Sequence, residues 1–317
     1  MALPASSKPP STGAPRARQP QPQRPVPPLD AKMTCDAAFR TIAGHYLRGL
    51  TAQHRATCGG NANALHEMRV ALTRLRTSIA FFSPMAKGLQ QKRLSDELKW
   101  LNAHLGVVRD LDVAIERLIA VNKKRSQVDF RSWQEEREAS QRHLTRALRS
   151  AKYRRLIKSI SRWIEKGAWS TKRGTQAAKR RACPVTEHGA LQLLQWRKKL
   201  IKRSRKVEAI GAKKRHRLRL LNKRLSYAIE AVTDLVSASE VSNQQATLKI
   251  LRKAQRSLGQ LNDDQKCRSL AATLGQGKAA SHLLLGPKRE RRLIRAAGAA
   301  YERLAELKPL RTRIGSD

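Results

Sequence analysis

The chain has 317 residues, and its 66 lysines and arginines against 24 acids give a formal net charge of +42. A compact body with that charge repels itself unless it is neutralised, so the expected partner is a polyanion: nucleic acid, polyphosphate or an anionic membrane surface. Four well-separated cysteines without a CxxC pair argue against a zinc site or a disulfide framework, and no apolar run is long enough to span a membrane.

Residues 1–29 are predicted to form a disordered tail. They hold nine of the 13 prolines, together with glutamine, serine and scattered arginines. This composition favours an extended polyproline II chain over a packed element. The start of the chain has no apolar core of signal-peptide length, so we expect a cytoplasmic protein whose body covers residues 30–317.

From about residue 33 the apolar residues recur at helical spacing, and no segment alternates with period two. The expected fold class is therefore all-α. Gly106 is expected to end or kink one helix, and the stretch 168–184 loses the period and is predicted to be a basic linker. The predicted helices span residues 38–53, 64–82, 94–106, 109–122, 132–150, 153–167, 187–209, 212–237, 244–259, 263–274 and 288–306.

The helix at 64–82 has two chemically different faces, and we expect Asn63 to cap its start and Pro84 to stop it. On a helical wheel, the apolar face that should build the core holds Leu65, Met68, Leu72, Leu75, Ile79 and Phe82. The polar and basic half holds His66, Arg69, Thr73, Arg74, Arg76 and Thr77. A single face of this kind could be explained as an ordinary charged surface exposed to solvent.

The same pattern recurs in the helix at 212–237. Its inward face is predicted to hold Leu218, Leu221, Leu225 and Ile229. Its outward face is predicted to hold His216, Arg219, Lys223, Arg224 and Tyr227. With the histidine as origin, the third and eighth following positions are both arginine in the two copies.

A second element also recurs, because "LNAHLGVVRDLD" at 101–112 matches "LRKAQRSLGQLNDDQ" at 251–265. The histidine-to-glycine separations are 40 and 43 residues. We interpret this as an internal duplication, with halves at about 33–167 and 185–306, which is too long a unit for a solenoid repeat. Two similar helical bundles around a pseudo-two-fold axis would bring the two basic helices towards each other.

These motifs resemble the CHAD family, the conserved-histidine α-helical domains. The likeness lies in "HEMRVALTRLR" followed by "LGVVRDLD", and in "HRLRLLNKRLSY" followed by "LGQLNDD", and it covers roughly residues 33–306. The resemblance implies a duplicated helical domain that binds inorganic polyphosphate through its motif helices and that, in some members, sits on polyphosphate granules. The binding residues it implies are His66, Arg69, Arg74, Arg76, Arg109, His216, Arg219, Lys223 and Arg224.

Three positions depart from the family pattern. Thr73 stands where the family usually has arginine or lysine, Ser226 where it often has arginine, and Asn262 replaces the arginine of the second Leu-Gly motif. We expect weaker binding at those points, or compensation by charges elsewhere. Asp110 and Asp112 are expected to orient arginines or to cap the helix after Gly106, rather than to hold a metal.

The residues favour binding over chemistry. The chain has no GxxxxGK loop, no ExExK signature and no zinc-ligand spacing, and the motif faces are nearly free of the acids that phosphoanhydride hydrolysis normally needs to hold a divalent metal. We therefore expect no catalysis, cofactor or metal. The scarcity of aromatic residues favours polyphosphate over single-stranded nucleic acid. A nucleoid or RNA-binding protein and an auxiliary protein of a polyphosphate-metabolising enzyme stay open as alternatives.

Overall fold

The structure is a computed structural model that describes residues 26–121, 128–171, 176–281 and 284–312. Within these ranges every regular element is a helix, apart from two isolated β-bridges, so the predicted all-α fold class is confirmed. The first seven helices are α1 (Cys35–Ala52), α2 (His54–Cys58), α3 (Ala62–Phe81), α4 (Ser83–Ala86), α5 (Leu89–Val121), α6 (Phe130–Arg149) and α7 (Ala151–Lys166). The later helices are α8 (Gln176–Ala182), α9 (Val185–Ser204), α10 (Ala212–Ala231), α11 (Val241–Thr273), α12 (Gly277–Ser281) and α13 (Pro287–Glu306), with short 3₁₀ helices at Thr233–Leu235 and Ala238–Glu240.

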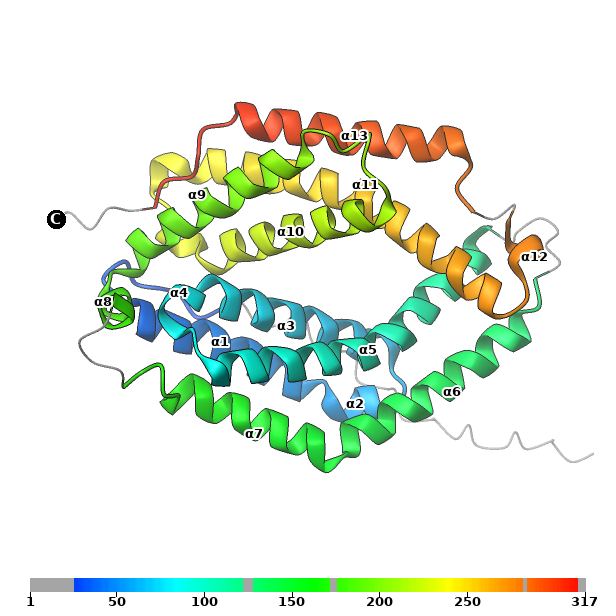
Figure 1. The fold of residues 1–317 in the computed structure, drawn as a ribbon, viewed down its shortest axis with the longest axis horizontal. Coiled ribbons are helices and arrows are strands. Elements are labelled where there is room, and N and C mark those ends of the chain that lie inside the picture. Colours follow the sequence, from blue (N-terminus) through cyan, green and yellow to red (C-terminus); the bar gives the residue numbers. More distant parts are fainter. Residues whose placement is uncertain (1–25, 122–127, 172–175, 282–283, 313–317) are drawn as a thin grey trace, which may run out of the picture.

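Two groups of helices face each other in Figure 1, with α1, α3, α5 and α7 on one side and α9, α10, α11 and α13 on the other. The groups touch where α3 meets α10 and where α5 meets α11. A third junction joins the start of α6 to the chain just before α12, because the Gln276 side chain donates to the Asp129 carbonyl at 3.0 Å and accepts from Trp133 Nε1 at 3.2 Å. The origin of the two groups in an internal duplication stays a prediction.

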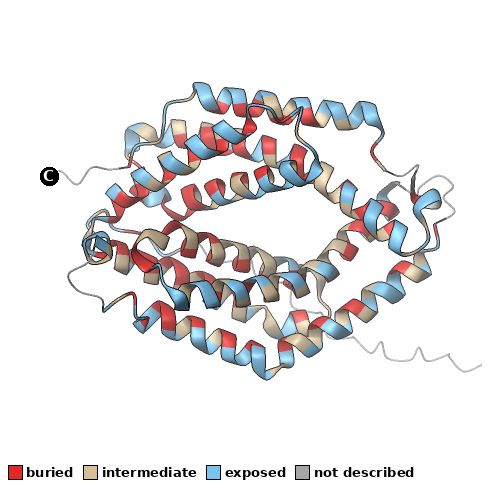
Figure 2. Ribbon diagram, viewed as in Figure 1, coloured by how far each residue is buried: buried red, intermediate tan, exposed pale blue. Residues whose placement is uncertain are grey.

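One apolar core runs through both groups of helices, and Figure 2 shows the buried positions along their inward sides. All six residues predicted for the apolar face of α3 are buried. Near the middle of the core, the ring of Phe39 lies 5.2–5.6 Å from the rings of Phe82, Trp163 and Trp169. A smaller apolar cluster around Trp133 joins α5 and α6 to α11. The two groups of helices are therefore packed together rather than tethered.

The predicted helix break at Gly106 is wrong. The helix α5 runs through Gly106 without interruption, and α11 runs through Gly259 in the same way, where two separate helices were predicted. A glycine inside a helix costs about 1 kcal/mol relative to alanine. In α5 that cost is outweighed by a continuous buried face on either side of the glycine, formed by Leu101, Leu105, Val108 and Leu111.

Smaller differences concern caps. The side chain of Asn61, not Asn63, caps α3 by accepting from the Ala64 backbone N–H at 2.9 Å. Helix α3 ends at Phe81 as Pro84 requires, and this proline then lies in the first turn of α4, where its missing N–H costs nothing.

The predicted linker and tail are more ordered than their compositions suggest. Within the stretch 168–184, Trp169 is buried and its Nε1 donates to the Trp163 carbonyl at 2.7 Å, and α8 follows. The body also begins before residue 30, since Leu29 is buried and its backbone N–H donates to Asp234 at 3.3 Å. Residues 1–25 of the predicted tail lie outside the described residues.

Candidate functional site

The basic faces of α3 and α10 lie against each other. Burial lowers the pKa of Arg69, and repulsion from Arg219 on α10 lowers it further. Burial and then Arg224 lower the pKa of Arg76. Because the residue numbers on the two helices rise together along these contacts, α3 and α10 run side by side in the same direction, as Figure 1 also shows. Cations separated by 150 residues in the sequence therefore share one surface.

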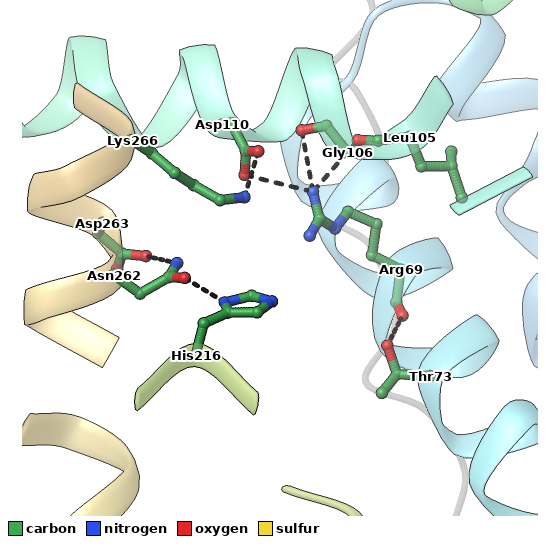
Figure 3. A network of polar contacts seen from close by, with 9 residues as sticks. All are labelled: Arg69, Thr73, Leu105, Gly106, Asp110, His216, Asn262, Asp263 and Lys266. Carbon is green, nitrogen blue, oxygen red and sulfur yellow. Dashed lines mark hydrogen bonds and ion pairs between the residues drawn. The ribbon is translucent and has the colours of Figure 1, made fainter. Parts of the chain in front are cut away.

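Arg69 is seated on the helix that carries the first Leu-Gly motif. Its Nη1 donates to the Leu105 carbonyl at 3.4 Å and the Gly106 carbonyl at 3.1 Å, and lies 3.7 Å from the Asp110 carboxylate (Figure 3). A Cβ atom added at Gly106 would lie 3.8 Å from this nitrogen, an ordinary van der Waals distance, so the guanidinium lies against the backbone of α5 at this glycine. Asp110 orients an arginine as predicted.

Arg219 lies on the second Leu-Gly motif in the same manner, but it is less engaged. A Cβ atom added at Gly259 would lie 3.8 Å from Arg219 Nε. Among the described residues, Nε has no hydrogen-bond partner and the guanidinium forms no ion pair. Arg69 is therefore anchored to protein acceptors, whereas the guanidinium of Arg219 is held by no acceptor among the described residues.

Lys223 lies next to both arginines and is half-buried. Burial, followed by repulsion from Arg219 and Arg69, lowers the pKa of the Lys223 ammonium from 10.5 to about 8, and Asp263 only partly opposes this. An anion that binds beside the Lys223 ammonium would stabilise its charged form. We refer to Arg69, Arg219 and Lys223 as the central cluster.

His66 lies at the edge of the central cluster. Although its ring is exposed, the surrounding protein partly desolvates it, and this lowers the pKa of His66. Repulsion from Arg109, Lys223 and Arg69 acts in the same direction, against an opposing effect of Glu67. The predicted shift towards the neutral form is confirmed for this histidine, but desolvation contributes more to it than the arginines do.

His216 has a different neighbour because Asn262 replaces an arginine. Its Nδ1 lies 2.5 Å from the Asn262 side-chain oxygen, and the Asn262 amide donates to Asp263 at 3.2 Å (Figure 3). Since an amide oxygen can only accept, Nδ1 carries the proton and Nε2 remains for a ligand. His216 also lines a pocket of about 400 Å³, together with Lys213, Arg215, Lys266 and Glu290.

Arg74 contacts an acid and two aromatic rings of the protein. Its guanidinium pairs with Glu230 of α10 at 3.2 Å and lies over the rings of Tyr46 and Tyr227 at 5.9 and 5.2 Å from their centres. Because Glu230 and Tyr227 belong to α10, whereas Arg74 belongs to α3, this arginine joins the two groups of helices. The geometry indicates a structural role for Arg74 in the unliganded protein.

Arg109 lies near His66 and Arg69, and it also forms an exposed ion pair with Glu116 at 3.2 Å. Sequence reasoning missed Lys266, whose ammonium contacts Asp110 across the junction of α5 and α11 (Figure 3). Its position about two helical turns after Gly259, on the same side of the helix, was the available signal.

Asp112 orients an arginine, as predicted, because it pairs with Arg137 of α6 at 2.9 Å. Neither Asp110 nor Asp112 caps a helix, since both lie within α5. Within the part of the chain that the structure describes, no three histidine, cysteine or acidic side chains gather in a way that could hold a metal ion. The arrangement of the central cluster can therefore bind and neutralise anions with the side chains it has.

Among the described helices, none is both long and apolar enough to cross a membrane. A family model described as the CHAD domain matches residues 41–272. The crystal structure of the CHAD domain from the plant Ricinus communis is similar, with a TM-score of 0.74 and 24% sequence identity over 94% of this chain and 100% of that one. PptA from Streptomyces chartreusis matches with a TM-score of 0.61 and 14% identity over 86% of this chain and 99% of the other. No curated protein sequence matches the chain.

Proposed function

Because the chain belongs to the CHAD domain family, we propose that it binds inorganic polyphosphate at the surface shared by α3 and α10. The observation that carries this proposal is the convergence of Arg69, Arg219 and Lys223 from two helices, in positions where burial and mutual repulsion lower the pKa of Arg69 and Lys223. A chain of phosphates brings closely spaced negative charges with no base to accommodate, and arginine can bind two phosphate oxygens at once.

The lack of a stacking platform favours polyphosphate over single-stranded nucleic acid. The ring of Tyr227 lies beside the central cluster, and it is already covered by Arg74 and Lys223, which lie 5.2 Å and 5.7 Å from its centre. Proteins that hold single strands usually offer open aromatic faces to the bases. Non-specific nucleic-acid binding is the second candidate, supported by the net charge alone.

We propose binding without catalysis. The acids beside the central cluster already have partners, since Asp110 contacts Arg69 and Lys266, and Asp263 accepts from Asn262. Hydrolysis of a phosphoanhydride normally needs carboxylates that are free to hold a divalent metal. An auxiliary role beside a separate polyphosphate-metabolising enzyme is compatible with the same surface.

The test is the double variant Arg69→Glu/Arg219→Glu, titrated with long-chain polyphosphate and competed with DNA and RNA of matched charge at physiological salt. We expect a much larger loss of affinity than with either single change, and displacement of polyphosphate by nucleic acid only at large excess. The matched control is Arg155→Glu/Arg162→Glu on the outer side of α7, where both arginines are exposed. Unchanged affinity in a folded double variant, or equal competition by nucleic acid, would contradict the proposal.

Granule association is part of the proposal and needs its own test. The motif-bearing body, rather than residues 1–25, should direct the protein to polyphosphate granules. A fluorescent fusion should begin at residue 26, because Leu29 packs on the body. Foci should form in cells that accumulate polyphosphate and become diffuse when its synthesis is blocked, whereas foci that persist without polyphosphate would point to a protein partner.

A further inference from the structure

A second basic surface lies where the end of α9 meets the start of α10. A hollow of about 250 Å³ is lined there by Arg203, Lys214 and Arg217, with Ile210 and Leu218 as its apolar part. We call these three cations and their hollow the corner surface. No carboxylate and no aromatic ring lines the hollow.

The three cations of the corner surface are not neutralised by the protein. All three are exposed, and among the described residues none of them forms an ion pair or a side-chain hydrogen bond. The neighbouring Arg215 is occupied, because it donates to the Ile210 carbonyl at 2.7 Å and pairs with Glu290 at 3.1 Å. A cluster of cations without acids attracts an anion of matching spacing.

The corner surface and the central cluster lie on opposite sides of α10. Arg217 and Arg219 are two residues apart, which separates their side chains by about 200° around a helix that turns about 100° per residue. Figure 1 shows α9 on the side of α10 that faces away from α3, and α10 contacts both helices. An anionic chain bound at the corner surface is therefore separated from an anionic chain bound at the central cluster by the width of α10, about 10 Å.

We propose that the corner surface is a second polyphosphate site, so that one protein molecule holds two separate segments and can bridge polyphosphate chains. This inference rests on the proposed function of the central cluster. The hollow has a volume of about 250 Å³, and all the charged side chains that line it are cations, which suits a chain of phosphates. The absence of an aromatic ring in the hollow removes the stacking that would favour a single-stranded nucleic acid. Bridging would turn a polyphosphate-binding protein into one that condenses its ligand.

Calorimetric titration with short-chain polyphosphate and light scattering with long-chain polyphosphate together test the inference. The wild type should bind two short segments per molecule and should scatter strongly with long chains. The variant Arg203→Gln/Lys214→Gln/Arg217→Gln should bind one segment with unchanged affinity at the remaining site and should lose the scattering. The matched control Arg291→Gln/Arg292→Gln/Arg295→Gln removes the same charge from exposed positions of α13 and should behave as the wild type.

The outcomes separate this inference from the proposed function. Two bound segments in the corner variant, or an equal loss of scattering in the α13 control, would overturn the second site while leaving the central cluster intact. The Arg69→Glu/Arg219→Glu variant should still bind one segment, at the corner surface. If the wild type binds one segment only, or if duplex DNA displaces the second segment more readily than polyphosphate does, the corner surface is not a polyphosphate site. Unchanged binding in the Arg69/Arg219 variant would instead reject the proposed function.

Discussion

Replacing Lys223 by methionine should stabilise the free protein and weaken its binding. Burial beside Arg219 and Arg69 lowers the pKa of Lys223 from 10.5 to about 8. At about 1.4 kcal/mol for each pH unit, the buried charge costs about 3 kcal/mol of folding free energy at pH 7. Methionine keeps much of the apolar stem without the charge. We expect the melting temperature of Lys223→Met to rise by about 6 °C, at about 2 °C per kcal/mol for a domain of this size.

The pH dependence of this gain has a definite sign. Between pH 8 and 10.5 the unfolded chain binds more protons at Lys223 than the folded protein, so wild-type stability rises with pH across this window. The difference in melting temperature between Lys223→Met and the wild type should therefore be largest below pH 8 and should vanish towards pH 10.5. Circular dichroism melts at several pH values measure it, with the exposed Lys202→Met as the control.

The side chain of Lys223 should also couple polyphosphate binding to proton uptake. At pH 8.5, a lysine with a pKa of about 8 is about one quarter protonated, so binding that restores its charge takes up about three quarters of a proton. Calorimetry in buffers of different ionisation enthalpy reports this uptake, and Lys223→Met should abolish it. A variant that melts at or below the wild-type temperature at pH 7, or that retains the proton uptake, would refute the assignment of Lys223 to the central cluster.

Three further expectations follow from single contacts. Because the pKa of His66 is lowered in the free protein, the stability of the free protein should decline as the pH falls below about 6.5, and polyphosphate affinity should rise over the same range. Binding assays at several pH values should show a smaller rise in affinity for His66→Gln. Gly106→Ala should stabilise α5 by about 1 kcal/mol and leave binding intact, whereas Gly106→Leu should displace Arg69 and weaken binding, as melts and titrations of the two variants would show. Arg74→Met should cost about 1–3 kcal/mol in urea unfolding, through loss of the Glu230 pair and the aromatic contacts, with little change in affinity.

The sequence was sufficient to predict which faces of α3 and α10 are apolar and which are basic, because the 3.6-residue period depends only on local spacing. It was not sufficient for the role of Gly106. A glycine in a helical pattern usually marks an end, but here the helix continues, and the side chain of Arg69 from another helix lies against the glycine. The local sequence around a glycine does not tell which residue of another helix packs against it.

The partners of the charged residues were the least predictable part. Arg74 and Arg69 lie on the same predicted face, yet Arg74 turns to Glu230, which is 156 residues away in the sequence. The corner surface combines Arg203 at the end of α9 with Arg217 in α10, and neither is among the binding residues that the family resemblance implied. Composition identified a large excess of cations, while only the packing of the helices separates those that hold the fold together from those that stay available for a ligand.

Thr73 tests whether the two motif helices are functionally equivalent. In the motif alignment Thr73 corresponds to Lys223, and the structure has its hydroxyl donating to the Arg69 carbonyl at 2.8 Å. Thr73→Lys would add a second ammonium close to Arg69, and we expect it to lower stability by about 1–3 kcal/mol and to raise polyphosphate affinity most at low salt, as more ions are then displaced together. Combining it with Lys223→Met restores the charge of the wild type, so urea unfolding and titration should then return towards wild-type values. If Thr73→Lys leaves both stability and affinity unchanged, positions 73 and 223 are not equivalent. The threonine would then not serve to avoid a second repulsion beside Arg69, in addition to the one that Lys223 creates.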